Sequence, residues 1–412
     1  MAVLHPFKGF RPTKELCSKV AALPYDVMSS LEAREMVKDD PYSFLHVDRA
    51  EVDLPIGTDI YSEAVYQKAA DNLNGMIEKG IYIQDNKPVL YIYRLTMDGR
   101  SQTGLVGCSS IDEYISGSIK KHELTRADKE QDRINHVDYC NANTGPIFLT
   151  YRGKAEIDAI IDEITKAPAE YDFVSEDGVS HTIWVIDNED TINKLTELFK
   201  GVESLYIADG HHRNASAVKV GIKRREEKGD YNGNEEFNFY LSVLFPDNQL
   251  RIMDYNRVVK DLNGLTKDEF FNTLSDKFEV EEVNSECKPT KAHTFGMYID
   301  KRWYLLTAKP SIIKNDAVEG LDVSILQNEV LSPILGIGDP RTDKRIDFVG
   351  GIRGLKELER RVDSGEMTLA FSMYPTSMAE LMEIADCGKI MPPKSTWFEP
   401  KLRSGIFVHK LD

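Results

Sequence analysis

The stretch Leu205-Tyr206-Ile207-Ala208-Asp209-Gly210-His211-His212-Arg213 decides the fold prediction, because a strand-like apolar run turns at Asp-Gly directly into a helical pattern. A helix that begins at such a corner leaves unpaired backbone N–H groups and the positive end of its dipole facing the turn. The potentially cationic side chains of His211, His212 and Arg213 lie at this point. The sequence therefore predicts an anion-binding site, with phosphate as the anion.

Other interpretations of the same residues stay open. The paired histidines could be polar loop residues, and an Asp-Gly corner is ordinary turn chemistry. Asp209, His211 and His212 could instead hold a metal ion.

Composition limits the classes of function. The chain has 412 residues, enough for two or three domains, and its 41% hydrophobic and 29% charged residues are typical of a soluble globular protein. The net charge of −17, from 68 acidic against 51 basic residues, disfavours nucleic acids and anionic membranes as partners. A small anionic ligand in a locally basic pocket remains compatible with this charge.

The five cysteines form no CxxC pair and no zinc-ligand spacing, which is typical of reduced thiols in a reducing compartment. The first residues lack the apolar core of a signal peptide, and no apolar run is long enough to cross a bilayer. We therefore expect a cytoplasmic protein.

The pattern of elements predicts an α+β fold rather than a regular β-α alternation. Ser29 or Ser30 should cap a helix that runs through Val37, and Asp98-Gly99 should connect a β-hairpin between residues 89 and 109. Further helices are expected at about 61–79, 155–166, 190–200, 266–277, 322–331, 353–364 and 376–386. Further strands are expected at 147–151, 181–187, 239–245, 278–283, 293–299, 302–307 and 368–373.

A second chemical segment, residues 120–133, is dense in charge and contains His122-Glu123. Most of it is typical of a solvated helix face with pairs such as Arg126–Glu130. A zinc-protease HExxH motif is excluded, because Arg126 stands where the second histidine is required. Neighbouring cations favour the ionised form of Glu123, which makes it a candidate proton acceptor.

A third segment, residues 391–401, carries three prolines that predict an extended loop. Its lysine, hydroxyls and aromatic ring suit a small polar ligand, although Trp397 and Phe398 could equally pack at the entry of a strand. Neither a GxxxxGK[ST] phosphate loop nor a GxGxxG motif occurs in the chain.

Taken in order, His122-Glu123, Asp209-Gly210-His211-His212-Arg213 and Pro393-Lys394-Ser395-Thr396 resemble the free L-serine kinases of the ParB/sulfiredoxin superfamily. Over its whole length the chain also resembles a large bacterial family long labelled as a domain of unknown function. A eukaryotic-parasite serine kinase that uses ATP is similar to that family. Two departures are clear: the archaeal kinases are shorter and use ADP, and Phe398 replaces an expected histidine.

The resemblance implies roles for particular residues. Glu123 and Asp209 would be catalytic, with Glu123 as general base, and the nucleotide phosphates would be bound by Asp209, Gly210, His211, His212 and Arg213. Serine would be bound by His122, Lys394, Ser395, Thr396 and Trp397. The metal ligands are unknown.

The resemblance also implies an activity and an architecture. The activity is transfer of the terminal phosphate of ATP, or alternatively of ADP, to free L-serine with Mg²⁺, within serine metabolism and cysteine biosynthesis. The alternative is a ParB-like nucleotide-binding switch that acts through a protein partner. The expected parts are an α+β region over 1–110, a ParB/sulfiredoxin-like nucleotide-binding domain over 111–260, and an α+β domain over 261–412. In the last of these, loop 391–405 is expected to return to the active site.

Overall fold

The computed structural model describes residues 1–412, and its contacts group the chain into two units. Unit 1 comprises Met1–Leu250 and Pro400–Asp412, and unit 2 comprises Arg251–Glu399. Helices and strands are mixed in both units, which confirms the α+β class. None of the helices combines the length and the apolar character that a membrane span requires.

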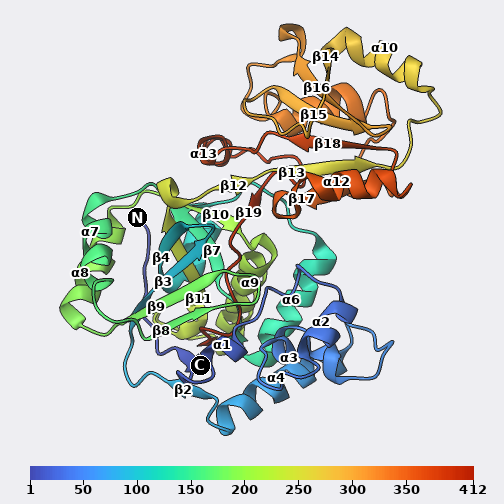
Figure 1. The fold of residues 1–412 in the computed structure, drawn as a ribbon. Coiled ribbons are helices and arrows are strands. Elements are labelled where there is room, and N and C mark those ends of the chain that lie inside the picture. Colours follow the sequence, from blue (N-terminus) through green and yellow to red (C-terminus); the bar gives the residue numbers. More distant parts are fainter. The chain divides into compact units, whose positions relative to one another are not determined.

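An eight-stranded sheet organises unit 1 (Figure 1). Its strands, in spatial order, are β5 (Ile119–Lys120), β10 (Leu205–Asp209), β7 (Ile147–Tyr151), β11 (Phe239–Pro246), β4 (Arg100–Ser110), β3 (Leu90–Met97), β9 (Ser180–Ile186) and β8 (Tyr171–Val174). The pairs β5–β10 and β7–β11 are parallel, and the others are antiparallel. The short strand β5 therefore lies beside β10, whose end is the predicted anion corner.

The predicted hairpin is present in the middle of this sheet. Asp98 and Gly99 both have left-handed backbone, with φ of 52° and 75°, as a tight two-residue turn between twisted strands requires. On its other side β4 pairs with β11, from Ser110 opposite Phe239 to Leu105 opposite Leu244. Residues 1–110 thus supply central strands to the same sheet as residues 111–250.

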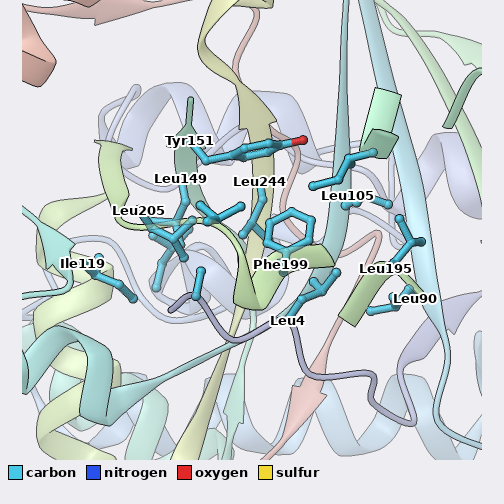
Figure 2. Close-up of a cluster of buried hydrophobic side chains, with 14 of the residues drawn as sticks. Leu4, Leu90, Leu105, Ile119, Leu149, Tyr151, Leu195, Phe199, Leu205 and Leu244 are labelled. Atoms are coloured by element: carbon cyan, nitrogen blue, oxygen red, sulfur yellow. The ribbon is translucent and has the colours of Figure 1, made fainter. Parts of the chain in front are cut away.

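Three helices bury apolar side chains against the sheet. They are α7 (Ala155–Ile164), α8 (Glu189–Lys200) and α9 (His211–Lys228). Figure 2 shows Leu195 and Phe199 of α8 among Leu149, Leu205 and Leu244 of the strands, and all five are fully buried. Burial of such a side chain contributes about 1.5–3 kcal/mol, so this cluster fixes the position of β10 and α9.

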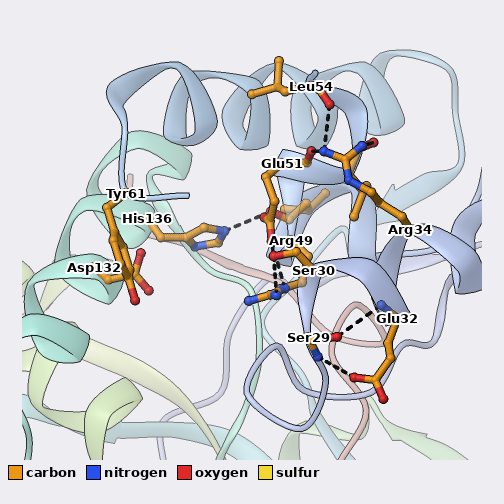
Figure 3. A network of polar contacts seen from close by, with 12 residues as sticks. Ser29, Ser30, Glu32, Arg34, Arg49, Glu51, Leu54, Tyr61, Asp132 and His136 are labelled. Atoms are coloured by element: carbon orange, nitrogen blue, oxygen red, sulfur yellow. Dashed lines mark hydrogen bonds and ion pairs between the residues drawn. The ribbon is translucent and has the colours of Figure 1, made fainter. Parts of the chain in front are cut away.

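The N-terminal helices are held by polar contacts (Figure 3). Ser29 and Glu32 form the capping box of α2 (Ser30–Val37), as the sequence predicts. Arg34 donates to the carbonyl oxygens of Val52 at 2.7 Å and Leu54 at 2.8 Å, which connects α2 to the end of the short helix at residues 50–53. The predicted helix at 61–79 is α4 (Glu63–Glu78).

The remaining elements of unit 1 are short, apart from helix α6 (Ala127–Cys140). They are β1 (Phe10–Pro12), α1 (Cys17–Val20), α3 (Leu45–Asp48), η1 (Ala50–Asp53), β2 (Tyr82–Gln84), α5 (Ile111–Ser116), α6 (Ala127–Cys140), β6 (Ala142–Asn143), η2 (Glu236–Asn238), η3 (Asp247–Gln249) and β20 (His409–Lys410). Helix α6 packs on α9, where Val137 and Val220 share a small apolar cluster.

Unit 2 contains a six-stranded antiparallel sheet. Its order is β14 (Phe278–Val283), β16 (Arg302–Ala308), β15 (Thr294–Ile299), β18 (Leu369–Met373), β13 (Tyr255–Val259) and β17 (Ile346–Gly350). The other elements are β12 (Ile252–Met253), α10 (Lys267–Lys277), η4 (Pro310–Ile312), α11 (Asp322–Leu326), η5 (Gln327–Leu331), η6 (Gly351–Arg353), α12 (Gly354–Asp363), α13 (Met378–Asp386) and β19 (Trp397–Phe398). The sequence pattern does not predict strands β13 and β17, because polar residues interrupt their apolar runs: Asn256 and Arg257 in β13, and Asp347 in β17.

Candidate functional site

The strand–corner–helix prediction at residues 205–213 is confirmed. The pairing of β10 with β7 shifts register between Ile207 and Asp209, and such irregularities redirect a side chain at the end of a strand. Gly210 then takes φ of 88° and ψ of 35°, a left-handed conformation that glycine adopts without steric cost. Helix α9 begins at the next residue, His211.

The chain leaving β5 carries His122 and Glu123 to the start of α9. Because β5 runs parallel to β10, the two strands end at the same edge of the sheet. Nδ1 of His211 lies 3.6 Å from Oε2 of Glu123, and the rings of His122 and His211 meet edge to face with centroids 4.5 Å apart. The structure thus brings the first two predicted segments together, and of the third segment its last residue, Lys401, contacts Asp209.

Both of these histidines are buried. The exposed fractions are 2% for His122 and 5% for His211. Nε2 of His211 has no hydrogen-bond partner, and neither ring nitrogen of His122 makes a hydrogen bond of ordinary geometry. Burial lowers the pKa of His122 to about 4, although Asp209 and, slightly, the nearby backbone of Ile207 act in the opposite direction, and burial with the neighbouring His122 lowers the pKa of His211 well below its usual value.

Both imidazoles are therefore neutral at pH 7, and the positive charge at the helix start is smaller than their residue types suggest. Burial also leaves His122 almost no surface for contact with a substrate, which weighs against its predicted role in serine binding.

Asp209 is held by two contacts. Its Oδ1 accepts the N–H of Gly210 at 2.8 Å, and its Oδ2 lies 3.1 Å from Nζ of Lys401. Burial by itself would raise the pKa of Asp209, but Lys401 and Arg213 hold it well below its usual value. Lys401 ends the third predicted segment, but sequence reasoning assigned it no role, because no local signal distinguishes it from other lysines.

The remaining two residues of the motif bind groups of the protein itself. Nε2 of His212 accepts the backbone N–H of Arg126 at 3.0 Å, which fixes the start of α6 against α9. Nη1 of Arg213 donates to the carbonyl oxygen of Pro146 at 2.8 Å. Contact of His212 and Arg213 with phosphate stays a prediction.

The charged segment pairs differently from the expected Arg126–Glu130 interaction. Arg126 binds Asp128 at 2.8 Å, whereas Glu130 pairs with Lys219 of α9. The reason is that α6 begins only at Ala127, so Arg126 is the residue that precedes the helix and cannot form the i,i+4 pair.

Most of the third predicted segment, residues 391–399, belongs to unit 2, whereas Pro400 and Lys401 belong to unit 1. Lys394 is exposed and has φ of 60°. The hydroxyl of Ser395 donates to the carbonyl oxygen of Pro392 at 2.6 Å, so it already has an acceptor within the loop. Trp397 packs edge-on against Tyr255, with ring centroids 5.0 Å apart. The contribution of Lys394, Ser395, Thr396 and Trp397 to the site stays a prediction.

The model of a family described as a protein of unknown function, DUF1015, matches residues 4–324. The chain belongs to the DUF1015 family. This confirms the resemblance to a family labelled as a domain of unknown function over residues 4–324, but not over the whole length of the chain. No curated protein sequence matches this DUF1015 protein significantly.

Solved structures similar to the DUF1015 protein are distant. A conserved hypothetical protein from Pyrococcus furiosus is 16% identical, with a TM-score of 0.34, over 73% of this chain and 93% of its own. A free serine kinase in complex with AMP is 14% identical, with a TM-score of 0.34, over 73% and 91%. A C-terminally truncated SbnI from Staphylococcus aureus is 10% identical, with a TM-score of 0.38, over 73% and 85%. Likenesses at this level do not assign an activity to the DUF1015 protein.

Proposed function

We propose that the protein is a kinase that transfers the terminal phosphate of a nucleotide, with ATP favoured over ADP, to the hydroxyl of free L-serine. The observation that supports this most directly is the 3.6 Å separation between Oε2 of Glu123 and Nδ1 of His211, the first residue of an 18-residue helix. It brings a carboxylate, the group needed to accept a proton, to a helix N-terminus, the group that binds phosphate.

The phosphates of the nucleotide would be bound by the backbone at the start of α9. The first N–H groups of a helix have no partner within the helix, and its dipole favours negative charge there. Gly210 has no side chain to keep a phosphate away from these groups. The ammonium of Lys401 offsets the charge of Asp209, which would otherwise repel the phosphates.

Glu123 would act on the other reactant. As the serine oxygen forms its bond to the terminal phosphorus, the bond from that phosphorus to the bridging oxygen breaks and the leaving nucleotide keeps the electron pair. The serine hydroxyl gives its proton to the carboxylate of Glu123. A glutamate is a weak base, but it suffices when the proton leaves late in the transition state.

The Mg²⁺ that the resemblance implies fits these residues poorly. Mg²⁺ prefers oxygen ligands in octahedral geometry, whereas the site offers imidazole nitrogens and an Asp209 that is already paired with Lys401. No protein residue is therefore assigned to Mg²⁺, and no step of the proposed transfer depends on it.

The decisive experiment is a screen of donors against acceptors, followed by phosphorus NMR. ATP, ADP and pyrophosphate are each incubated with L-serine, L-threonine or L-homoserine, and O-phospho-L-serine is the expected product. Nucleotide turnover that is indifferent to serine would instead favour the ParB-like switch. A protein that turns over none of the donors would exclude both.

Variants assign the base. Glu123→Gln should lower turnover by about two to four orders of magnitude while nucleotide affinity stays nearly unchanged. Asp128→Asn is the matched control, because Asp128 lies in the same segment with its side chain 54% exposed. Near-normal turnover in Glu123→Gln would exclude Glu123 as the base.

The proposed serine site has its own test. If Lys394 binds the serine carboxylate, Lys394→Ala should raise the KM for serine and leave the Kd for nucleotide unchanged. An unchanged KM for serine would remove Lys394 from the substrate site.

A further inference from the structure

We propose that His122, Glu123 and His211 form a binding site for one divalent transition-metal ion. One ring nitrogen from each histidine and one carboxylate oxygen from Glu123 all lie within 4.8 Å of one another. Ligands about 2.0–2.1 Å from one ion in tetrahedral geometry are about 3.3–3.4 Å apart. The 3.6 Å between Nδ1 of His211 and Oε2 of Glu123 is close to this separation, and small side-chain movements would bring the donors around one ion.

The burial and the hydrogen bonding of the two histidines also favour a metal site. Buried polar atoms in proteins nearly always have a hydrogen-bond partner, and each exception calls for an explanation. Here Nε2 of His211 is buried without one, and the two ring nitrogens of His122 have at most a weak contact with the backbone of Ile207. A neutral imidazole carries one nitrogen with a lone pair, and a metal ion bound there would give each ring a partner.

The donor types select the class of metal. Two imidazoles and one carboxylate are the ligands of catalytic zinc sites and of non-haem iron sites, whereas Mg²⁺ and Ca²⁺ prefer oxygen. Three protein ligands leave at least one coordination position for water or for an oxygen of a bound molecule.

The architecture also suits a metal site. His122 and Glu123 are adjacent in the segment after β5, and His211 starts α9, so the three ligands come from two elements of unit 1 held by the same sheet. Asp209 and His212 were the other ligands considered from the sequence. Asp209 instead pairs with Lys401, and His212 binds the backbone of Arg126.

The test uses the full chain, stripped with a chelator and then titrated with Co²⁺ in the absence of nucleotide and serine. The visible absorption bands of Co²⁺ report its ligands, and one ion per chain is expected. His122→Gln and His211→Gln should each weaken Co²⁺ binding by roughly 100-fold or more, because each removes a ligand. His46→Gln is the control, since His46 binds Asp53 at 2.8 Å in another part of unit 1.

Three results would overturn the proposal. These are a folded wild-type protein that takes up no Co²⁺, equal uptake in both ligand variants and the wild type, and a loss of uptake in the control. Circular dichroism checks folding. If the histidine variants do not fold, Glu123→Gln replaces them, because the side chain of Glu123 is 40% exposed and tolerates the change. Unaltered Co²⁺ binding and spectrum in Glu123→Gln would then refute the site.

The metal proposal does not rest on the kinase proposal. Binding is measured without reactants, so a chain that makes no O-phosphoserine can still bind Co²⁺, and a chain that binds no Co²⁺ can still be a kinase. If both hold, Glu123 cannot offer the same oxygen to a metal and to a proton. Zn²⁺ should then inhibit phosphate transfer in the presence of excess Mg²⁺.

Discussion

Gly210 provides a sharp test of how the start of α9 is held. A Cβ added at this position would lie 3.0 Å from Nε of Arg213 and 3.2 Å from its Cζ, while the backbone keeps φ of 88°. The left-handed backbone costs a non-glycine residue about 1–2 kcal/mol. The guanidinium must also move, which weakens its 2.8 Å hydrogen bond to Pro146, and a bond of this charged type contributes about 1.5–3 kcal/mol. We therefore expect Gly210→Ala to lower the free energy of unfolding by about 2–4 kcal/mol, measured by urea denaturation.

Gly117 supplies the matched control for this prediction. It also has left-handed backbone, with φ of 80°, but nothing lies within 4 Å of its added Cβ. Gly117→Ala should therefore cost only the backbone part, about 1–2 kcal/mol. In an Arg213→Met background, Gly210→Ala should cost the same as Gly117→Ala. Equal losses for Gly210→Ala and Gly117→Ala in the wild-type background would refute the reasoning, because they would show that Arg213 is not held against the corner.

Three further predictions concern single groups of the chain. Burial raises the pKa of Glu113 from 4.5 to about 7, against backbone hydrogen bonds that lower it, so the native state holds this proton more tightly than the unfolded chain does. The resulting stabilisation is complete below about pH 4.5 and is lost as the pH rises through about 7. In urea titrations Glu113→Gln should therefore be as stable as the wild type near pH 4, and near pH 8 more stable by at most about 3 kcal/mol. An equal difference in stability between the two proteins at both pH values would contradict the raised pKa. Lys401→Met should destabilise the protein by about 2 kcal/mol at pH 7, a moderate cost because the unpaired carboxylate of Asp209 is 31% exposed. Lys401→Arg keeps the positive charge and should destabilise it much less. Equal melting curves for the two variants would disprove the role of the ion pair. A disulfide reagent should modify Cys387 rapidly in the native protein, and rapid reaction of further thiols would contradict the buried positions of Cys17, Cys108, Cys140 and Cys287.

The features that the sequence predicts well are local ones. The corner at Asp209-Gly210, the hairpin at Asp98-Gly99 and the cap at Ser29 each follow from a few neighbouring residues. An Asp-Gly pair at a turn, and a serine three residues before a glutamate, can be recognised in the sequence alone, because each device needs only residues that are near neighbours.

The features that escape prediction depend on residues far apart in the chain. The approach of Glu123 to His211 depends on β5, a strand of two residues that no hydrophobic pattern can reveal. The pairing of Lys401 with Asp209 joins positions 192 residues apart. The neutrality of the two histidines depends on burial, which only the packed structure defines.

The division of the chain has a consequence for its synthesis. Residues 400–412 belong to unit 1 although all of unit 2 precedes them, and they supply both Lys401 and β20, which pairs with β6. A nascent polypeptide that has emerged only as far as residue 250 therefore lacks β20, the partner strand of β6, and Lys401, the counter-charge of Asp209. Unit 2 must leave the ribosome before unit 1 can close, so assembly of the candidate site is a late event in the life of each new molecule.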